Sequence, residues 1–364
     1  MNRRHVLAGA ALLATQANAA AAQPEPGLAA LAAENGLFYG AAAQARDLDA
    51  DAAYANLIRR ECACLVPEWE MKWQAIEAEA GRLTPGLMDR FAGIVSASGF
   101  WMRGHTLFWH ESLPDWFEAS VQAASDWDRV IVPYAEFIAQ RYAGHLRHWD
   151  VLNEAINPDD GRAGQLRHWR LTELFGEDFP NRAFALAHRL APRAKLFYND
   201  YGLEYHSTWH EARRSAVLKA LERWIRAGVP VHGLGIQGHL TANGKYSLDV
   251  MPLRHFLSDV AALGLEIVIS ELDVRETNFD RPLAERDQAV ADETARFLEV
   301  VLDEPAVSGI VTWGCSDRYS WLTRIHDPRN RGLPFDAELR KKPMWHAIAH
   351  SLYHAPQRLP SLSR

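Results

Sequence analysis

Residues 147–154 read RHWDVLNE and residues 266–273 read EIVISELD. Each stretch is a short, largely apolar run that leads to a glutamate with other polar residues beside it. Runs of this length are typical of strands buried on both faces, as in parallel sheets covered by helices. The two stretches therefore predict an α/β fold whose polar side chains gather at the ends of its strands.

Six further short apolar or aromatic runs accompany these two, with amphipathic stretches between them. In one such stretch Val217, Leu221 and Trp224 share a helical face, and Gly228 ends the helix. The candidate strands are residues 37–42, 62–67, 100–107, 147–153, 195–199, 231–237, 266–271 and 309–314. Eight strands alternating with helices predict a single (β/α)8 TIM barrel with enlarged loops after the strands. The alternative is a doubly wound parallel sheet.

One motif favours that alternative. Gly233, Gly235 and Gly238 spell G-x-G-x-x-G, which in a dinucleotide site must form a turn that opens a helix. Here the glycines lie largely inside the candidate strand 231–237, and residues 239–244 do not begin a helix. The motif is therefore interpreted as coincidence.

A further helix is expected around Val130, Tyr134 and Phe137, which repeat at helical spacing. Ser125 and Asp128 are spaced as a capping box and predict where this helix begins.

Length and composition exclude several classes. The chain has 364 residues, 48% hydrophobic and 23% charged, which suits a soluble globular protein with a large core. A net charge of -7 excludes a dedicated nucleic-acid binder, which needs a basic excess. Cys62, Cys64 and Cys315 are too few for a disulfide framework and are expected to act as small hydrophobic residues. The 13 tryptophans suit either a core or stacking on sugars.

The first 22 residues read as a signal peptide. Arg3 and Arg4 give a cationic start, an apolar run follows, and residues 17–19 form a small-residue cleavage site. The paired arginines permit a twin-arginine route, and the other interpretation is a frayed helix of the mature protein. We expect an exported protein, periplasmic or secreted, whose catalytic barrel occupies residues 23–364.

In a (β/α)8 barrel the active site lies at the carboxyl ends of the strands. Glu154 and Glu271 both occupy such positions. One glutamate at a strand end is ordinarily a surface residue or a cap, but two among other polar strand ends indicate a functional site. Their neighbours at strand ends are Glu68, Lys72, His105, Trp109, Asn153, Asn199, Asp200, Gln237, His239, Asp273 and Trp313.

Two carboxylates that face one pocket suggest glycoside hydrolysis, in which one donates a proton and the other attacks or activates water. Burial against nearby tryptophans would raise the pKa of one carboxyl and so supply the acid. Asn153 suits a hydrogen bond to a sugar 2-hydroxyl. His239, with Asp273 or Glu271, could hold the nucleophile ionised.

The same residues resemble a known family. Six blocks, in order along residues 35 to 352, are similar to glycoside hydrolase family 10, the endo-1,4-β-xylanases. They are RGHTLFWH (103–110), WDVLNEA (149–155), YNDY (198–201), QGHL (237–240), SELD (270–273), and WG (313–314) followed by residues 317–321.

The resemblance implies a retaining double displacement in which Glu154 is the acid/base and Glu271 the nucleophile. By the same resemblance Asn153 contacts the 2-hydroxyl, while His239 and Asp273 support Glu271. Further positions match the sugar-binding cleft: Glu68, Lys72, His105, Trp109, Gln237, Trp313 and Trp321. The retaining mechanism predicts about 5–5.5 Å between the two carboxyl groups.

The chain departs from this family at Trp69. The family usually carries Pro-Glu-Asn-Glu-Met-Lys after the second strand, whereas residues 67–72 read PEWEMK. An indole in place of the amide removes a directional polar contact and adds bulk and a stacking face. We expect Trp69 to reshape that part of the sugar-binding site, unless it packs under the loop.

Three function classes remain open. They are a xylan-cleaving glycosidase, a related retaining barrel glycosidase acting on another β-1,4 glycan or on aryl glycosides, and a carbohydrate-binding protein on the same scaffold. The paired glutamates argue against the last, because a binder needs no matched acid and nucleophile. Xylan or xylo-oligosaccharides are the expected partners. We expect no nucleic-acid partner, no cofactor and no metal. The mature chain is expected to be a monomer without a membrane span.

Overall fold

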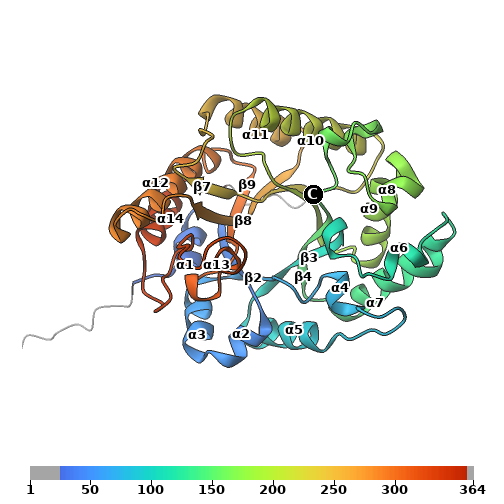
Figure 1. Ribbon diagram of the computed structural model, residues 1–364, viewed down its shortest axis with the longest axis horizontal. Coiled ribbons are helices and arrows are strands. Elements are labelled where there is room, and N and C mark those ends of the chain that lie inside the picture. Colours follow the sequence, from blue (N-terminus) through green and yellow to red (C-terminus); the bar gives the residue numbers. More distant parts are fainter. Residues whose placement is uncertain (1–24, 359–364) are drawn as a thin grey trace, which may run out of the picture.

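A computed structural model describes residues 25–358 of the chain, so the expected signal peptide lies outside the described residues. Parallel strands form a closed inner barrel, and helices surround it (Figure 1). The eight barrel strands are β1 (Phe38–Ala43), β2 (Cys64–Pro67), β3 (Trp101–Trp109), β4 (Leu146–Asn153), β5 (Lys195–Asp200), β6 (Gly233–Ile236), β8 (Glu266–Glu276) and β9 (Val307–Thr312). All eight predicted strands are confirmed, and the fold is a (β/α)8 barrel.

Closure of the barrel depends on two pairings, β1 with β9 and β6 with β8. A ninth short strand, β7 (His239–Ala242), continues β6 after a turn at Gly238, whose φ is +76°. β6 pairs with the first half of β8, and β7 pairs with its second half after a one-residue register shift. The shift places His239 directly opposite Asp273.

The α-helices between and around the strands vary from single turns to helices of 19 residues. They are α1 (Leu28–Glu34), α2 (Ala45–Ala50), α3 (Ala52–Glu61), α4 (Trp73–Ile76), α5 (Gly86–Ser98), α6 (Phe117–Ser120), α7 (Val132–Tyr142), α8 (Arg170–Phe175), α9 (Phe179–Leu190), α10 (Thr208–Arg226), α11 (Val250–Ala262), α12 (Leu283–Val301), α13 (Trp321–Ile325) and α14 (Pro343–His354). None of the helices in the described part of the chain is long and apolar enough to cross a membrane.

The start of α7 corrects one prediction. A π-helical turn, Trp127–Ile131, precedes α7, and neither has a side-chain cap. Asp126 is the residue that precedes this turn. Its carboxylate accepts hydrogen bonds from the backbone N–H groups of Gln122 and Ala123, in the turn before it, rather than from the helix. The expected capping box of Ser125 and Asp128 is therefore wrong.

The interior of the barrel is polar and explains the glycine motif. The guanidinium of Arg103 on β3 forms a buried ion pair with Asp150 on β4. A Cβ at Gly235 would lie 2.0 Å from the Asn199 amide oxygen and 2.9 Å from the Arg103 guanidinium. Gly233 and Gly235 belong to β6, and β7 rather than a helix follows them. Gly235 makes room for polar groups and Gly233 for the Phe197 ring, and their place inside a strand confirms that they do not form a dinucleotide motif.

The three cysteines are buried and free, as expected of small hydrophobic residues. The tryptophans divide between the two roles that composition left open. Trp73, Trp149 and Trp345 are fully buried in the core, whereas others line the main cleft.

Candidate active site

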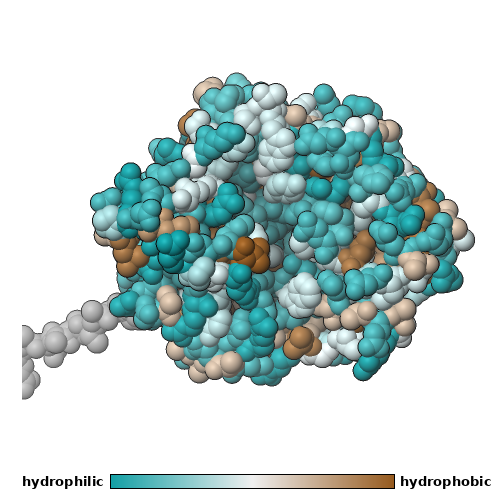
Figure 2. Space-filling view, in the orientation of Figure 1, coloured by the Kyte–Doolittle hydropathy of each residue, from teal (hydrophilic) through white to brown (hydrophobic). Residues whose placement is uncertain are grey.

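A cleft of about 640 Å³ opens at the carboxyl ends of the strands. In Figure 2 the face toward the viewer is hollowed near its middle, inside the ring of helices. Of the residues predicted from sequence, the cleft is lined by Lys72, His105, Trp109, Asn153, Glu154, Gln237, His239, Glu271, Trp313 and Trp321. Asp273, fully buried, supports this wall from behind, through His239 and Trp321.

Glu271 lies on β8 and is surrounded by hydrogen-bond donors. His239 Nε2 lies 3.3 Å from one carboxylate oxygen, and Asn199 Nδ2 donates to the other at 2.6 Å. Burial alone would raise the pKa of Glu271, but His105, His239 and Asn199 outweigh it and lower the pKa to about 2. The carboxylate is therefore ionised at neutral pH, as a nucleophile must be.

His239 owes its charge to a second carboxylate. Its Nδ1 lies 2.9 Å from Asp273, whose other oxygen accepts the indole N–H of Trp321. Burial alone would lower the pKa of His239, but Asp273 and Glu271 outweigh it and raise the pKa well above its ordinary value. The imidazolium donates to Glu271 and holds it in position, so His239 contacts both of the carboxylates that the sequence offered as alternative partners.

Glu154 follows β4 directly and has different surroundings. Its donors are neutral amides, Gln237 Nε2 at 3.0 Å and Asn153 Nδ2 at 3.3 Å. Burial raises its pKa, and the nearby charges of Asp200 and Glu271 raise it further against the hydrogen bond from Gln237. A carboxyl with a raised pKa can hold the proton that a general acid must donate.

The backbone at Glu154 is held in an unusual conformation. Its φ is +55°, a left-handed value that is uncommon outside glycine and clusters at functional sites. The Glu154 N–H donates to the Asn199 carbonyl at 2.9 Å, and Arg167 donates to the Glu154 carbonyl at 2.7 Å. These bonds fix the carboxyl where β4 meets the cleft.

Asn199, the penultimate residue of β5, was expected at a strand end but was given no role in the site. Its Nδ2 donates to Asn153 Oδ1 at 2.8 Å as well as to Glu271, and its Oδ1 accepts the Ser270 hydroxyl. One buried amide therefore connects the loop that carries Glu154 to the nucleophile. Its position at a strand end was the available signal, but its partners depend on barrel closure.

The wall on the β2 and β3 side combines a cation with aromatic rings. Lys72 Nζ lies 4.7 Å from the Trp109 ring centre, and burial lowers the pKa of Lys72 against the attraction of nearby carboxylates. His105 bonds to Asp150 at 3.1 Å and packs edge-on against Trp313, with ring centres 5.1 Å apart. This wall offers ammonium, imidazole and indole groups to a polyhydroxylated ligand.

Glu68 and Trp69 do not line this cleft. Glu68 is tied to Gln44 and Arg324, while burial raises its pKa. Trp69 is 39% exposed, and its ring centre lies 5.7 Å from Lys72 Nζ. Trp69 therefore is not packed under its loop and stands beside the cleft, and the effect of both residues on substrate stays a prediction.

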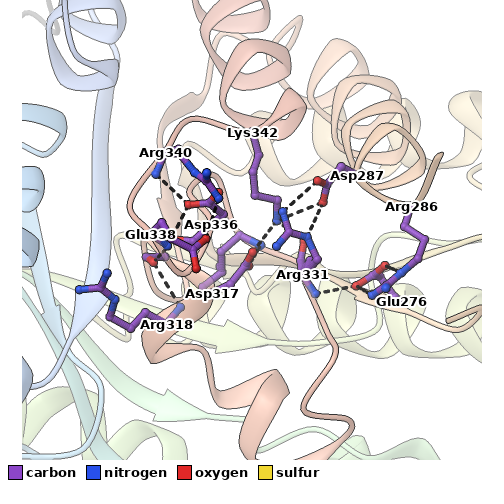
Figure 3. A network of polar contacts seen from close by, with 12 residues as sticks. Glu276, Arg286, Asp287, Asp317, Arg318, Arg331, Asp336, Glu338, Arg340 and Lys342 are labelled. Carbon is purple, nitrogen blue, oxygen red and sulfur yellow. Dashed lines mark hydrogen bonds and ion pairs between the residues drawn. The ribbon is translucent and has the colours of Figure 1, made fainter. Parts of the chain in front are cut away.

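A network of ion pairs supports the segment that carries Trp321 (Figure 3). Asp317 accepts from Lys342 Nζ at 2.8 Å, and Arg331 pairs with Asp287 of α12 at 2.9 Å. Together these pairs tie the chain after β9 to α12. The indole of Trp321 is thereby held against the Asp273–His239 pair, at 5.1 Å between the Trp321 and His239 ring centres.

The cleft extends beyond the predicted residues. Among the unpredicted residues that line it are Glu111, Tyr201, Glu204, Trp209, Lys245, Tyr246 and Arg275. Arg275 lies near the end of β8 and Tyr201 directly follows β5, whereas the others lie on loops and helices away from the strand ends, where strand-end reasoning did not select them. The tryptophan count was the one signal that pointed toward Trp209.

Within the described residues, one set of side chains could offer three ligands to a metal ion. The ligand atoms of His110, Glu111 and Glu154 lie within 4.8 Å of one another. A metal there would compete for the Glu154 carboxyl, so we expect chelators not to lower activity.

Known proteins resemble this chain along most of its length. Residues 27–351 match the family described as "Glycosyl hydrolase family 10". Endo-1,4-beta-xylanase 1 of Humicola insolens is 32% identical over 346 residues, 93% of this chain and 77% of the relative. Endo-1,4-beta-xylanase A of Fusarium oxysporum f. sp. lycopersici is 29% identical over 331 residues, 89% of this chain and 97% of the relative.

Solved structures agree. Native xylanase 10B from Thermotoga maritima has a TM-score of 0.81 and 29% identity, covering 90% of this chain and 98% of its own. Xylanase 10B from Thermotoga petrophila RKU-1, solved in complex with xylobiose, has a TM-score of 0.82 and 29% identity, covering 91% and 98%.

Proposed function

The chain belongs to glycosyl hydrolase family 10, and on this premise we propose that it is an endo-1,4-β-xylanase that acts by retaining double displacement. The observation that carries the proposal is the opposite tuning of two carboxyls in one cleft. The pKa of Glu271 is lowered to about 2, whereas that of Glu154 is raised. Such a pair supplies a nucleophile and an acid at the same pH.

In the first step the ionised Glu271 attacks the anomeric carbon of the bound sugar. Glu154 donates its proton to the glycosidic oxygen, so the leaving chain departs as a neutral alcohol and a glycosyl ester forms on Glu271. The His239 imidazolium orients the attacking carboxylate. In this proposal the Asn153 amide, which contacts the Glu154 carboxyl, donates to the sugar 2-hydroxyl.

In the second step Glu154, now ionised, takes a proton from water. The water attacks the anomeric carbon and Glu271 leaves as carboxylate, which restores both groups and the original anomeric configuration. The mechanism needs about 5–5.5 Å between the two carboxyl groups. A chain of amides connects the two carboxyls, because Asn199 bonds to Glu271 and to Asn153, and Asn153 bonds to Glu154.

A second substrate class is favoured by Trp69. Its exposed indole stands beside Lys72, where the family usually has an asparagine. The same chemistry would then act on another β-1,4 glycan or on a substituted xylan. Release of gluco-oligosaccharides or manno-oligosaccharides in place of xylo-oligosaccharides would identify this class. In Trp69→Asn, unchanged kcat/KM on linear xylo-oligosaccharides of every length would exclude a role for Trp69.

Activity on xylan, with Glu271→Ala measured in parallel and supplied with azide, tests the proposal. We expect xylo-oligosaccharides from the parent and none from the variant. Azide should restore turnover on an activated aryl xyloside and give the inverted, α-configured glycosyl azide. A β-configured azide, or no rescue, would contradict the assignment of Glu271. An inactive parent on xylan would contradict the substrate.

We also propose that the protein is exported and acts as a monomer. The cationic start, apolar run and small-residue site of residues 1–22 support export. Cell fractionation, with N-terminal sequencing of the mature protein, tests export and cleavage. Replacing Arg3 and Arg4 by lysine tests the twin-arginine route, and light scattering measures the oligomeric state.

A further inference from the structure

Trp209 is a large aromatic residue that the catalytic chemistry leaves unexplained. It is the second residue of α10, lines the cleft, and is 37% exposed. Its indole N–H donates to Asp159 Oδ2 at 3.0 Å. Leaving a tryptophan ring partly in water forfeits hydrophobic stabilisation. The hydrogen bond nevertheless fixes the ring in one orientation.

The chain also makes room for this ring. Gly202 has φ +69°, and a Cβ there would lie 2.5 Å from the Trp209 ring. The indole therefore rests directly on the Gly202 backbone. Two further groups flank the indole. The Tyr201 ring, in the same loop as Gly202, lies 6.1 Å from it between ring centres, and the Arg213 guanidinium of α10 lies 5.2 Å from the Trp209 ring centre. Four neighbours thus hold an exposed ring rigidly, which removes most of the entropy cost of stacking a ligand on it.

The position of Trp209 relative to Glu154 tells which part of a substrate it meets. Asp159 lies in the loop after β4, five residues beyond Glu154. Arg167 connects this loop to the next, because it bonds to the Glu154 carbonyl at 2.7 Å and to the Tyr201 hydroxyl at 3.1 Å. The leaving chain must lie beside the carboxyl that protonates its oxygen. Trp209 is therefore on the side of the leaving chain.

Further aromatic rings continue this wall. The centre of the His210 ring lies 4.9 Å from the centre of the Trp209 ring and 4.9 Å from the centre of the Tyr246 ring. Tyr246 is 43% exposed and lines the same cleft. A wall of this length suits an extended ligand rather than a single small molecule.

We propose that Trp209 forms a distal binding subsite, where its indole stacks on a pyranose ring of the leaving β-1,4-linked chain. Asp159 is its positioning residue and Gly202 provides the space beneath it. The inference rests on the proposed glycosidase function and deepens it, since it predicts that activity depends on the length of chain beyond the cleavage point. Stacking of this kind is worth about tenfold in affinity.

The test compares xylohexaose with an aryl xylobioside, which carries no sugar on the leaving side. We expect Trp209→Ala to lower the ratio of kcat/KM on the hexaose to kcat/KM on the aryl substrate about tenfold. Gly202→Ala, which keeps the indole but displaces it, should lower the same ratio. Tyr353→Ala on α14, which removes an exposed aromatic ring outside the cleft, is the matched control and should leave the ratio unchanged.

An unchanged ratio in Trp209→Ala would overturn the subsite. If Trp209→Ala fails to fold, Trp209→Phe keeps a smaller stacking face and should lower the ratio less. A parent that cleaves the aryl substrate but no xylo-oligosaccharide would contradict the proposed substrate instead. Calorimetry of xylohexaose binding to Glu271→Gln, with and without Trp209→Ala, then decides the subsite independently: equal affinities overturn it, and an about tenfold loss supports it.

Discussion

Glu154 directly follows β4 and Glu271 lies midway along β8, and although both face one cleft, their surroundings differ. Glu271 faces the His239 imidazolium and the Asn199 amide. Glu154 receives only neutral amide donors and lies near the negative charge of Asp200. Burial raises the pKa of both, but only at Glu271 is it outweighed.

The neighbours of each carboxyl, rather than the strand that carries it, therefore set its role. A cation within hydrogen-bond distance keeps a buried carboxylate ionised, while neutral amides orient a carboxyl without fixing its charge. The acid must lose and regain a proton in every cycle, so the weaker environment suits Glu154. The nucleophile must stay charged until it attacks.

The largest effect is expected from Glu154→Gln. On xylan, loss of the acid should lower kcat/KM by about 10²–10⁴-fold. An aryl xyloside with an activated leaving group needs little protonation, so its first step should be nearly unaffected. Stopped-flow measurement should show a burst of aryl alcohol followed by slow turnover, because the second step has lost its base.

The pH profile gives the same comparison in the parent. Since the pKa of Glu154 is raised and that of Glu271 is about 2, kcat/KM on xylan should fall on the alkaline side as Glu154 ionises. In Glu154→Gln the alkaline fall should vanish for the activated substrate. Glu111→Gln, which changes another carboxyl of the cleft, is the matched control and should keep it. Equal losses on both substrates would exclude Glu154 as the acid.

A smaller effect is expected from His239→Asn, which removes the cation beside Glu271. At neutral pH we expect a loss of about 10–100-fold from poorer positioning. The pKa of Glu271 should rise, so the acidic fall of kcat/KM should move upward from about pH 2. His326→Asn, beside Trp321 but not bonded to Glu271, is the control. If the acidic fall of kcat/KM does not move in His239→Asn, His239 does not stabilise the negative charge of Glu271.

The sequence predicted much of this arrangement because its strands carry the chemistry at their ends. Local pattern identified all eight barrel strands, and the two glutamates followed from barrel geometry. His239 and Asp273 were also found, although the register shift that pairs them was not. These features depend on order along the chain and on one rule of the fold.

What the sequence did not reveal depends on contacts between distant elements. Asn199 joins Glu271 to Asn153 only because β4, β5 and β8 converge inside the barrel. Gly235 is required by Arg103 and Asn199, neither of which is near it in sequence. The prediction of a capping box before α7 was wrong for a related reason, since the Asp126 carboxylate bonds to the turn before it.

The smallest effect is expected on stability, at a third buried carboxyl. Asp317 differs from Glu271 because burial outweighs its cation: its pKa is raised to about 6, although Lys342 lies 2.8 Å away. A carboxyl whose pKa is higher in the folded than in the unfolded state stabilises the fold most when the pH is below its unfolded-state pKa, where it is protonated. For Asp317 this contribution is lost as the pH rises through about 6. Lowering the pH from 7 to 4 should therefore favour the parent over Asp317→Asn by up to about 3 kcal/mol. Thermal unfolding at both values measures this as a gain of several degrees in the parent's Tm relative to the variant's. If the Tm difference instead moves toward the variant at low pH, the Lys342 ion pair dominates, and Asp317 belongs with Glu271 rather than with Glu154.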